Sequence, residues 1–270
     1  MSHLLEFLKT GDRWAQSDGS PKAACVVIAL SLLGLGVASG GASQTAQSSP
    51  KTMKPAAAAA KTTTAKAPQA LGAPVKAYGS KDAPIMMEVF SDYQCPSCRN
   101  LFENTLRLMI NDYVASGKVY LVHRDFPLSV HKHSGEAARW ANAAAHVGEF
   151  QTVEAALYDN QDSWQADGNV AKFISAAMSA AQFKRVEAIA MSCGYPAIQS
   201  KFDGSNPLAQ VPHPCALDVP IAQDIETGYK IPVQATPTYV ISYKGQRLPP
   251  GSGVVSWPIL KQFLDSLLTQ

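Results

Sequence analysis

Apolar positions from about Val75 onward follow the spacings of strands and helices. Residues 85–90 (IMMEVF) and 118–123 (KVYLVH) are short, mostly apolar runs bounded by polar or proline-containing segments, which is typical of buried strands. Between them, from 96 to about 116, apolar side chains recur three and four residues apart. That spacing predicts an amphipathic helix that begins soon after the first strand.

Between the second strand and about residue 191 the chain is predicted to be helical, and strands are predicted again near the C-terminal end. Four segments have helical composition or spacing: 134–147, about 148–160, 170–180 and 181–191. Strands at 238–243 and 246–248 flank Lys244-Gly245, which is a hairpin signal, and a helix over 256–268 closes the chain. The order predicts an α/β fold in which a block of helices interrupts a sheet.

The first 74 residues have a different character. Residues 23–39 contain no charged side chain and follow Arg13 and Lys22, which is typical of a membrane-targeting segment. Two interpretations stay open: an uncleaved anchor preceded by a polar lead at 1–22, or a cleaved signal peptide. Residues 40–74 are mainly Ala, Ser, Thr, Lys and Pro, which predicts a disordered linker before a folded region over 75–270.

Charge and cysteine content narrow the possible functions. The chain has 23 basic and 21 acidic residues and a net charge of +2, which lacks the strongly basic footprint of a nucleic-acid-binding protein. Of the five cysteines, Cys25 lies in the apolar N-terminal segment, where we interpret it as a small apolar residue. The other four lie in the folded region, and an even number suits disulfide chemistry in an exported protein.

Cys95-Pro96-Ser97-Cys98 stands at the predicted start of the helix over 96–116. Backbone N–H groups and the dipole at a helix N-terminus stabilise a thiolate, so Cys95 is predicted to be the attacking sulfur and Cys98 the buried resolving one. Pro96 suits the first helical turn, and Ser97 adds no charge. A metal-binding or inert CxxC stays open as an alternative, although zinc sites normally need a second ligand pair and only His213 lies near Cys215.

Thr236-Pro237 immediately precedes the strand at 238–243. Proline is tolerated at the start of a strand, so this dipeptide alone indicates no more than an ordinary turn before the strand. Its position matters because a strand–CxxC–helix unit followed by a Thr-Pro–strand–hairpin–helix unit is the order of a thioredoxin fold.

Three motifs in collinear order resemble the DsbA-like family of bacterial thiol–disulfide oxidoreductases. They are residues 89–98 (VFSDYQCPSC), residues 125–128 (DFPL) with His131 or His133 nearby and an alanine-rich helix after them, and residues 235–240 (ATPTYV). The similarity extends from about Gly79 to Gln270.

The resemblance implies a thioredoxin-like fold with a helical domain inserted over about 131–225. It also implies that Pro237 is cis and faces the CxxC motif, and that the backbone of Thr236 pairs with a substrate peptide. The expected substrates are cysteine-containing exported proteins, with a membrane redox partner for recycling and no cofactor. The expected location is the periplasm or another extracytoplasmic space, at the bacterial inner membrane if the N-terminal segment is an anchor and soluble if it is cleaved.

Two positions depart from the family pattern. Many relatives carry an acidic residue six positions before the first cysteine, where this chain has Val89. Glu88 is adjacent, but neighbouring strand residues point to opposite faces, so the role is not transferred to it. The most oxidising relatives carry His where this chain has Ser97, which leaves open whether the protein oxidises thiols or reduces and isomerises disulfides.

The remaining residues have less specific interpretations. Cys193 and Cys215 are predicted to form a structural disulfide, with free buried thiols or a second redox pair as alternatives. His131 and His133 are either loop residues that modulate the site or ordinary surface or helix-entry residues. Three aromatic residues are predicted to lie in the core or at a domain interface: Trp140, Tyr158 and Trp164. A metal- or peptide-binding module, or a scaffold with an inert CxxC, is the alternative to an enzyme.

Overall fold

Strand β2 (Ile85–Ser91) is the centre of the sheet in the computed structural model. It pairs in parallel with β3 (Val119–Asp125) and antiparallel with β4 (Thr238–Tyr243). The sheet has the order β1-β3-β2-β4-β5, and β6 pairs with β4. The three short strands are β1 (Ala77–Tyr78), β5 (Gln246–Arg247) and β6 (Gly251–Ser252).

The structure describes residues 75–194, 197–200 and 215–270, which belong to one compact unit. The segments predicted at 1–22, 23–39 and 40–74 lie outside these residues, as does His213. Among the helices of the described part, none is long and apolar enough to cross a membrane.

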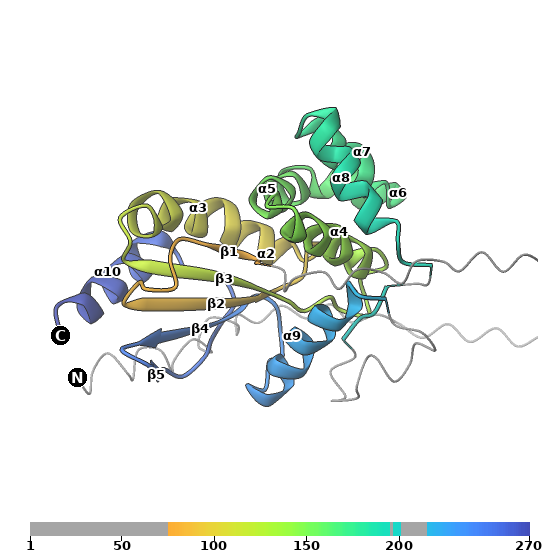
Figure 1. Ribbon diagram of the computed structural model, residues 1–270. Coiled ribbons are helices and arrows are strands. Elements are labelled where there is room, and N and C mark those ends of the chain that lie inside the picture. The colour runs from red at the N-terminus through yellow and green to blue at the C-terminus, as the bar shows by residue number, and fades with distance from the viewer. Residues whose placement is uncertain (1–74, 195–196, 201–214) are drawn as a thin grey trace, which may run out of the picture. The chain divides into compact units, whose positions relative to one another are not determined.

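The helix predicted over 96–116 is one continuous stretch with π-type turns. It runs through α2 (Pro96–Leu101), η1 (Phe102–Leu106), α3 (Arg107–Met109) and η2 (Ile110–Val114). The last helix, α10 (Trp257–Leu268), packs against η1 and α3. Helix α9 (Asp218–Lys230), which was not predicted, lies on the opposite side of the sheet from α2 and contacts β3 (Figure 1).

Five helices follow β3 and form the predicted helical block. They are α4 (Ser134–His146), α5 (Phe150–Asp159), α6 (Gln161–Asp167), α7 (Val170–Ala176) and α8 (Ala180–Ala190). The predicted helix over 170–180 is too long, because the Ser179 side chain accepts a hydrogen bond from the Gln182 N–H and begins a new helix there. Helix α6 was not predicted, and α9 crosses the predicted end of the insert near residue 225.

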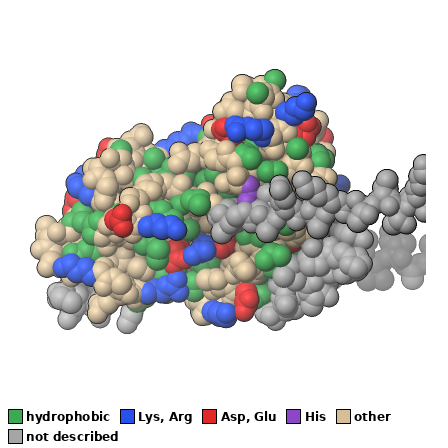
Figure 2. Space-filling model, viewed as in Figure 1, with side chains coloured by type: hydrophobic (Ala, Val, Ile, Leu, Met, Phe, Trp, Pro, Cys, Tyr) green, Lys and Arg blue, Asp and Glu red, His purple; other side chains and the backbone are tan. Residues whose placement is uncertain are grey.

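The core runs from the sheet into the helical block. Trp140, Tyr158 and Trp164 are all buried, which confirms their interpretation as core residues. The Trp140 and Phe183 rings stack with centroids 5.9 Å apart, and the Trp164 indole N–H donates to the Leu157 carbonyl oxygen. On the visible face of Figure 2, basic and acidic side chains are interspersed with apolar ones.

The strands present different chemistry on their two faces. Towards α9, Glu88 binds Arg124, with Glu88 Oε1 2.9 Å from Arg124 Nε and 2.6 Å from Nη2, and Arg124 also binds Asp224 of α9. Arg247 of β5 binds the second Glu88 oxygen at 2.5 Å. Val89 is buried on the other face, beside Cys98. The alternation expected for a strand therefore separates the two residues as predicted.

Helix α9 approaches the sheet closely at Gly228. A Cβ atom at this position would lie 2.5 Å from the Phe126 ring and 3.3 Å from the Phe90 ring. Because no side chain fits in that space, the glycine allows the close contact between helix and sheet.

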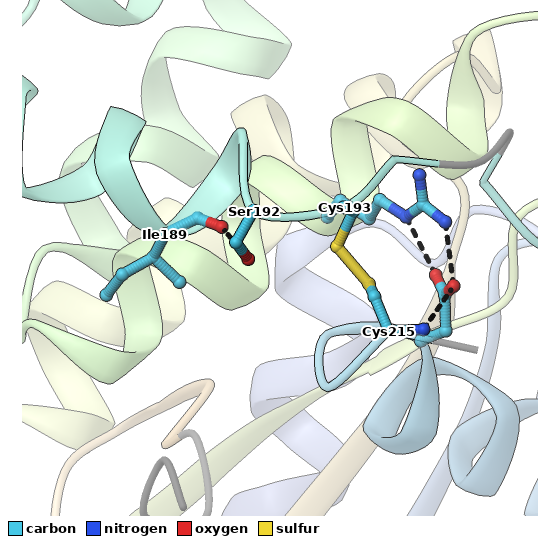
Figure 3. The surroundings of a disulfide bond; sticks show 6 residues. Ile189, Ser192, Cys193 and Cys215 are labelled. Carbon is cyan, nitrogen blue, oxygen red and sulfur yellow. Dashed lines mark hydrogen bonds and ion pairs between the residues drawn. A yellow bond between two sulfur atoms is a disulfide. The ribbon is translucent and has the colours of Figure 1, made fainter. Parts of the chain in front are cut away.

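Two links join the helical block to α9. A disulfide connects Cys193, after α8, with Cys215, before α9, with Cα atoms 5.5 Å apart (Figure 3). Arg139 of α4 and Asp218 of α9 form a buried bidentate ion pair, with contacts of 2.8 Å from Nε and 2.7 Å from Nη2. The Asp218 carboxylate also accepts from the Cys215 backbone N–H at 3.4 Å.

Replacing Arg139 should destabilise the domain strongly. The Arg139→Met variant keeps most of the side-chain volume but leaves Asp218 buried without its guanidinium partner. We expect the free energy of unfolding to fall by about 3–5 kcal/mol, measured by urea denaturation. The matched control is Lys230→Met, which breaks an exposed pair with Glu226 and should cost less than about 1 kcal/mol. Equal losses in the two variants would contradict a dominant role for the buried pair.

Candidate active site

The CxxC motif lies at the N-terminus of α2, directly after the turn that ends β2. Cys95 is the N-cap residue and Pro96 occupies the first turn, while the backbone N–H groups of Cys98 and Arg99 donate to the Cys95 carbonyl oxygen at 3.1 and 3.2 Å. Pro96 and Ser97 are exposed, whereas Cys95 is 7% exposed and Cys98 only 1%. Both cysteines are free thiols. The sulfur at the edge of the surface is therefore that of Cys95.

The two thiols have opposite acidities. A hydrogen bond from the Cys98 side chain is the main cause that lowers the pKa of Cys95 to about 6, helped by the backbone N–H groups of Cys98 and Ser97 and opposed by burial. Burial raises the pKa of Cys98 well above its ordinary value, and the neighbouring Cys95 sulfur adds to the effect. At neutral pH the pair therefore holds one nucleophilic thiolate and one neutral thiol.

Thr236 and Pro237 lie opposite Cys95. The Cys95 thiol donates to the Thr236 carbonyl oxygen at 3.3 Å, and the Thr236–Pro237 peptide bond is cis. The pairing of β4 with β2 explains this placement, because Thr238 is in register with Phe90 and the residues before β4 then reach the end of β2. Two segments 141 residues apart thus meet at the reactive sulfur.

Asp92 organises the loop between β2 and Cys95. Its carboxylate accepts from the backbone N–H groups of Gln94 (2.7 Å) and Leu128 (2.6 Å), and it lies 2.9 Å from His131 Nδ1. Its own backbone N–H points at the Cys98 sulfur, 3.5 Å away. The hydrogen bond to Asp92 raises the pKa of His131, so an imidazolium is favoured near the CxxC motif.

The two candidate histidines differ in their relation to this loop. The His131 ring binds Asp92, whereas His133 meets the loop through its backbone N–H, which donates to the Gln94 side chain. The His133 ring lies near Gly168 instead. Of the two, His131 is the one whose side chain reaches the loop beside the CxxC motif.

Several residues of the site were not identified from the sequence. The Gln161 side-chain amide of α6 donates to the carbonyl oxygens of Tyr93 (2.7 Å) and Cys95 (3.1 Å), so it fixes the loop from the helical block. Behind Cys98, His123 of β3 and Glu154 of α5 form a buried pair. No local spacing in the sequence indicates these contacts, because each joins segments at least 31 residues apart.

The described residues offer no group of three or more His, Cys, Asp or Glu side chains arranged to hold a metal ion. Cys193 and Cys215 are joined to each other, and Cys95 and Cys98 face a carbonyl oxygen and backbone N–H groups. The arrangement is suited to sulfur exchange at Cys95.

Comparison with known proteins identifies the family. The family model described as Thioredoxin matches residues 73–244, a range that includes both Cys95-Cys98 and Thr236-Pro237. The chain belongs to the thioredoxin family. No curated protein sequence matches it.

Solved structures with the same fold include a DsbA protein and BdbD. alpha-DsbA1 of Wolbachia pipientis is 18% identical, with a TM-score of 0.51 over 72% of this chain and 90% of that one. BdbD of Bacillus subtilis, in its oxidised form, is 17% identical, with a TM-score of 0.50 over 74% of this chain and 97% of that one. These similarities confirm the predicted thioredoxin-like α/β fold with its helical block, and family membership supports an oxidoreductase role.

The acidity of Cys95 can be measured directly. We expect thiolate absorbance near 240 nm in the reduced protein to rise with a midpoint near pH 6, since the pKa of Cys95 is about 6. The Cys98→Ala variant removes the main hydrogen bond to the thiolate and should move the midpoint upward. A midpoint that stays in place in this variant would contradict the assigned cause.

The same pKa difference predicts how stability depends on pH. In the folded reduced protein the pKa of Cys95 is about 6, whereas the pKa of an ordinary thiol is 9.0, so folding favours the Cys95 thiolate. This contribution to stability is fully present above about pH 9 and is lost as pH falls through 6. The gap between the unfolding free energies of reduced and oxidised protein should change over this window, because oxidised Cys95 does not titrate. A constant gap between pH 5 and 9 would contradict this prediction.

Proposed function

We propose that the protein is an exported thiol–disulfide oxidoreductase that introduces or exchanges disulfides through its Cys95-Pro96-Ser97-Cys98 centre. The observation that carries this proposal is the pair of unequal thiols: Cys95, with its lowered pKa and 7% exposure, stands in front of the buried Cys98. A thiolate that is stable at neutral pH favours the reduced state of the centre, which gives the oxidised state its power to oxidise other thiols.

In this proposal a substrate thiolate attacks the Cys95 sulfur of the oxidised centre. The bond between Cys95 and Cys98 breaks, its electron pair goes to Cys98, and a mixed disulfide joins the substrate to Cys95. A second substrate thiolate then attacks the substrate sulfur, which forms the substrate disulfide and releases Cys95 as a thiolate. The reduced centre is reoxidised by a redox partner, for which we propose a membrane protein.

We assign Thr236 and Pro237 to substrate binding. The support is the contact of 3.3 Å between the Cys95 sulfur and the Thr236 carbonyl oxygen, which places a backbone acceptor beside the sulfur that the substrate thiolate attacks. A substrate strand that hydrogen-bonds to this backbone would present its cysteine to Cys95. Pro96 and Ser97, exposed between the two cysteines, would then border the substrate.

The direction of the reaction separates an oxidase from the alternative reductase or isomerase. A Cys95 pKa of about 6 lies between those of thioredoxin, about 7, and DsbA, about 3.5. We expect a reduction potential between roughly −270 and −120 mV, the values for those two proteins. Equilibration of the full-length protein with glutathione measures it. A value at or below that of thioredoxin would overturn the oxidase proposal in favour of the reductase.

Disulfide formation should depend on Cys95, whose sulfur the substrate thiolate attacks. The oxidised wild-type protein is expected to form disulfides in a reduced, unfolded substrate protein. Cys95→Ser should abolish this activity, whereas the matched control Cys25→Ser should retain it, since Cys25 lies in the apolar N-terminal segment. Metal bound to the reduced protein at one equivalent, without disulfide formation, would favour the alternative of a metal carrier.

We also propose an extracytoplasmic location. The support is the uncharged segment at 23–39 together with the disulfide between Cys193 and Cys215, because such bonds persist in oxidising compartments. Alkaline phosphatase fused after residue 74 should be active in bacterial cells if the segment exports the chain. The mass of the mature protein then distinguishes an anchor, which keeps residues 1–39, from a cleaved signal peptide.

A further inference from the structure

A small cavity lies against the buried sulfur of the redox centre. Its volume is about 10 Å³, close to the smallest space that holds one water molecule. Both apolar and polar side chains line it, and the polar ones come from β1, β2, β3, α2 and α5. The lining residues that carry the argument are Cys98, Ser91, His123, Glu154 and Tyr158.

His123 and Glu154 form a buried pair at this cavity. His123 Nδ1 lies 2.7 Å from Glu154 Oε1, and both side chains are 5% exposed. The Tyr78 hydroxyl donates to the other carboxylate oxygen of Glu154 at 2.6 Å, and the Tyr93 ring stacks on the imidazole with centroids 4.9 Å apart. The pair is thus contacted by Tyr78 of β1 and by Tyr93 of the loop before Cys95.

The surrounding charges favour a protonated imidazole. His123 Nε2 lies 3.3 Å from Asp125 Oδ1, and Asp125 is bound by Lys76, which also binds Asp224. Burial opposes protonation of His123, but the nearby Asp125 carboxylate and the hydrogen bond to Glu154 outweigh it and raise the pKa of His123 to about 9. The charged and titratable groups around the imidazole, its carboxylate partners and the cavity are Lys76, Tyr78, Tyr93, Cys98, Asp125, Glu154 and Tyr158. At neutral pH the site therefore stores a proton.

The redox step creates a need for that proton. When the disulfide of the centre opens, the electron pair goes to Cys98, which is only 1% exposed and whose thiol pKa is raised well above the ordinary value by burial. A buried thiolate without a counter-charge is a poor leaving group. Bulk water has little access to Cys98, so the proton must come from within the domain.

We propose that the His123–Glu154 pair delivers a proton across this cavity to the Cys98 sulfur as the Cys95–Cys98 disulfide opens. The proton leaves His123 Nδ1, passes through the Glu154 carboxylate and one water molecule, and forms the S–H bond of Cys98. The substrate thiolate supplies the electron pair that forms its bond to Cys95. His123 becomes neutral, and it regains a proton before the next turnover. The inference rests on the proposed thiol–disulfide exchange at Cys95.

The pair acts on Cys98 across the cavity, so the two residues are positioning residues rather than groups in contact with substrate. They lie on β3 and α5, on the face of the sheet opposite Glu88. A carboxylate supplied by the helical block therefore serves Cys98 although the strand position beside it holds Val89. Since the imidazolium is more acidic than the Cys98 thiol, proton transfer favours opening of the disulfide, which is the direction that oxidises substrate.

The test follows the reduction of the oxidised, full-length protein by dithiothreitol between pH 6 and 10. Reactions are quenched with acid and alkylated, and the rate constant is expressed per dithiothreitol thiolate. For the wild type we expect a constant value at neutral pH and a decline above about pH 9, as His123 loses its proton. A value that does not decline up to pH 10 would overturn the inference. This measurement needs no variant, so it is independent of whether the variants fold.

Glu154→Gln removes the carboxylate that relays the proton and holds the imidazolium. We expect the rate constant at pH 7.5 to fall roughly tenfold or more, which is below the full effect of general acid catalysis. The decline with pH should also begin at a lower pH. The matched control is Glu226→Gln, an exposed glutamate on α9 that should leave the rate constant and the profile unchanged. The thiolate midpoint of Cys95 should stay near pH 6 in both variants, which shows that the centre itself is intact.

The outcomes separate the two proposals. If Cys95 of the oxidised wild type does not react with dithiothreitol, the proposed function fails and the inference fails with it. If the wild type reacts and the folded Glu154→Gln variant has the same rate constant and the same pH profile, the function stands and the proton-delivery role is overturned. A slower variant whose pH profile keeps the wild-type shape would also overturn it, because a purely structural role predicts that result.

Discussion

The pairing of β2 on both of its edges is the constraint on which the rest of the structure depends. Parallel pairing with β3 and antiparallel pairing with β4 bury the strand and fix where its C-terminal end lies. That end leads through a short loop into Cys95, and the start of β4 brings Thr236 to the same point. A slip of one residue in either ladder would turn every strand side chain to the opposite face and would separate the sulfur from the carbonyl oxygen.

Strand alternation also divides the charged groups into two sets. On one face, Glu88 and Arg124 join the sheet to α9, where the contacts tie elements together. On the other face, His123 and Glu154 border the cavity next to Cys98. Lys76 connects the sets, because it binds both Asp125 and Asp224. The same two strands therefore contribute to a structural ion network on one face and to the His123–Glu154 pair on the other, without direct contact between Glu88 and the CxxC motif.

The sequence alone predicted the elements of the fold whose signals lie within a few neighbouring residues. The strand at 85–90, the helix that begins after Cys95 and the hairpin around Lys244-Gly245 depend on residue spacing and turn chemistry that act over a few positions. Helix α9 was not predicted because Pro220 and Gly228 weaken its local helical pattern. Its formation depends on packing against Phe126, which the sequence does not indicate. The Cys95 site was predictable because its motif is contiguous. His123 and Glu154 were not, because neither residue carries a local sign of its partner.

Gln161 has a consequence for attempts to shorten the protein. Its side chain belongs to the helical block, yet it donates to the carbonyl oxygens of Tyr93 and Cys95 in the loop that leads into the CxxC motif. A minimal thioredoxin domain made by joining β3 directly to α9 would remove these bonds together with Glu154 and the Arg139–Asp218 pair. Such a truncation would leave two polar groups of the loop to be satisfied by solvent. The helical block is thus an integral part of the reactive loop's support, and it cannot be treated as a removable module.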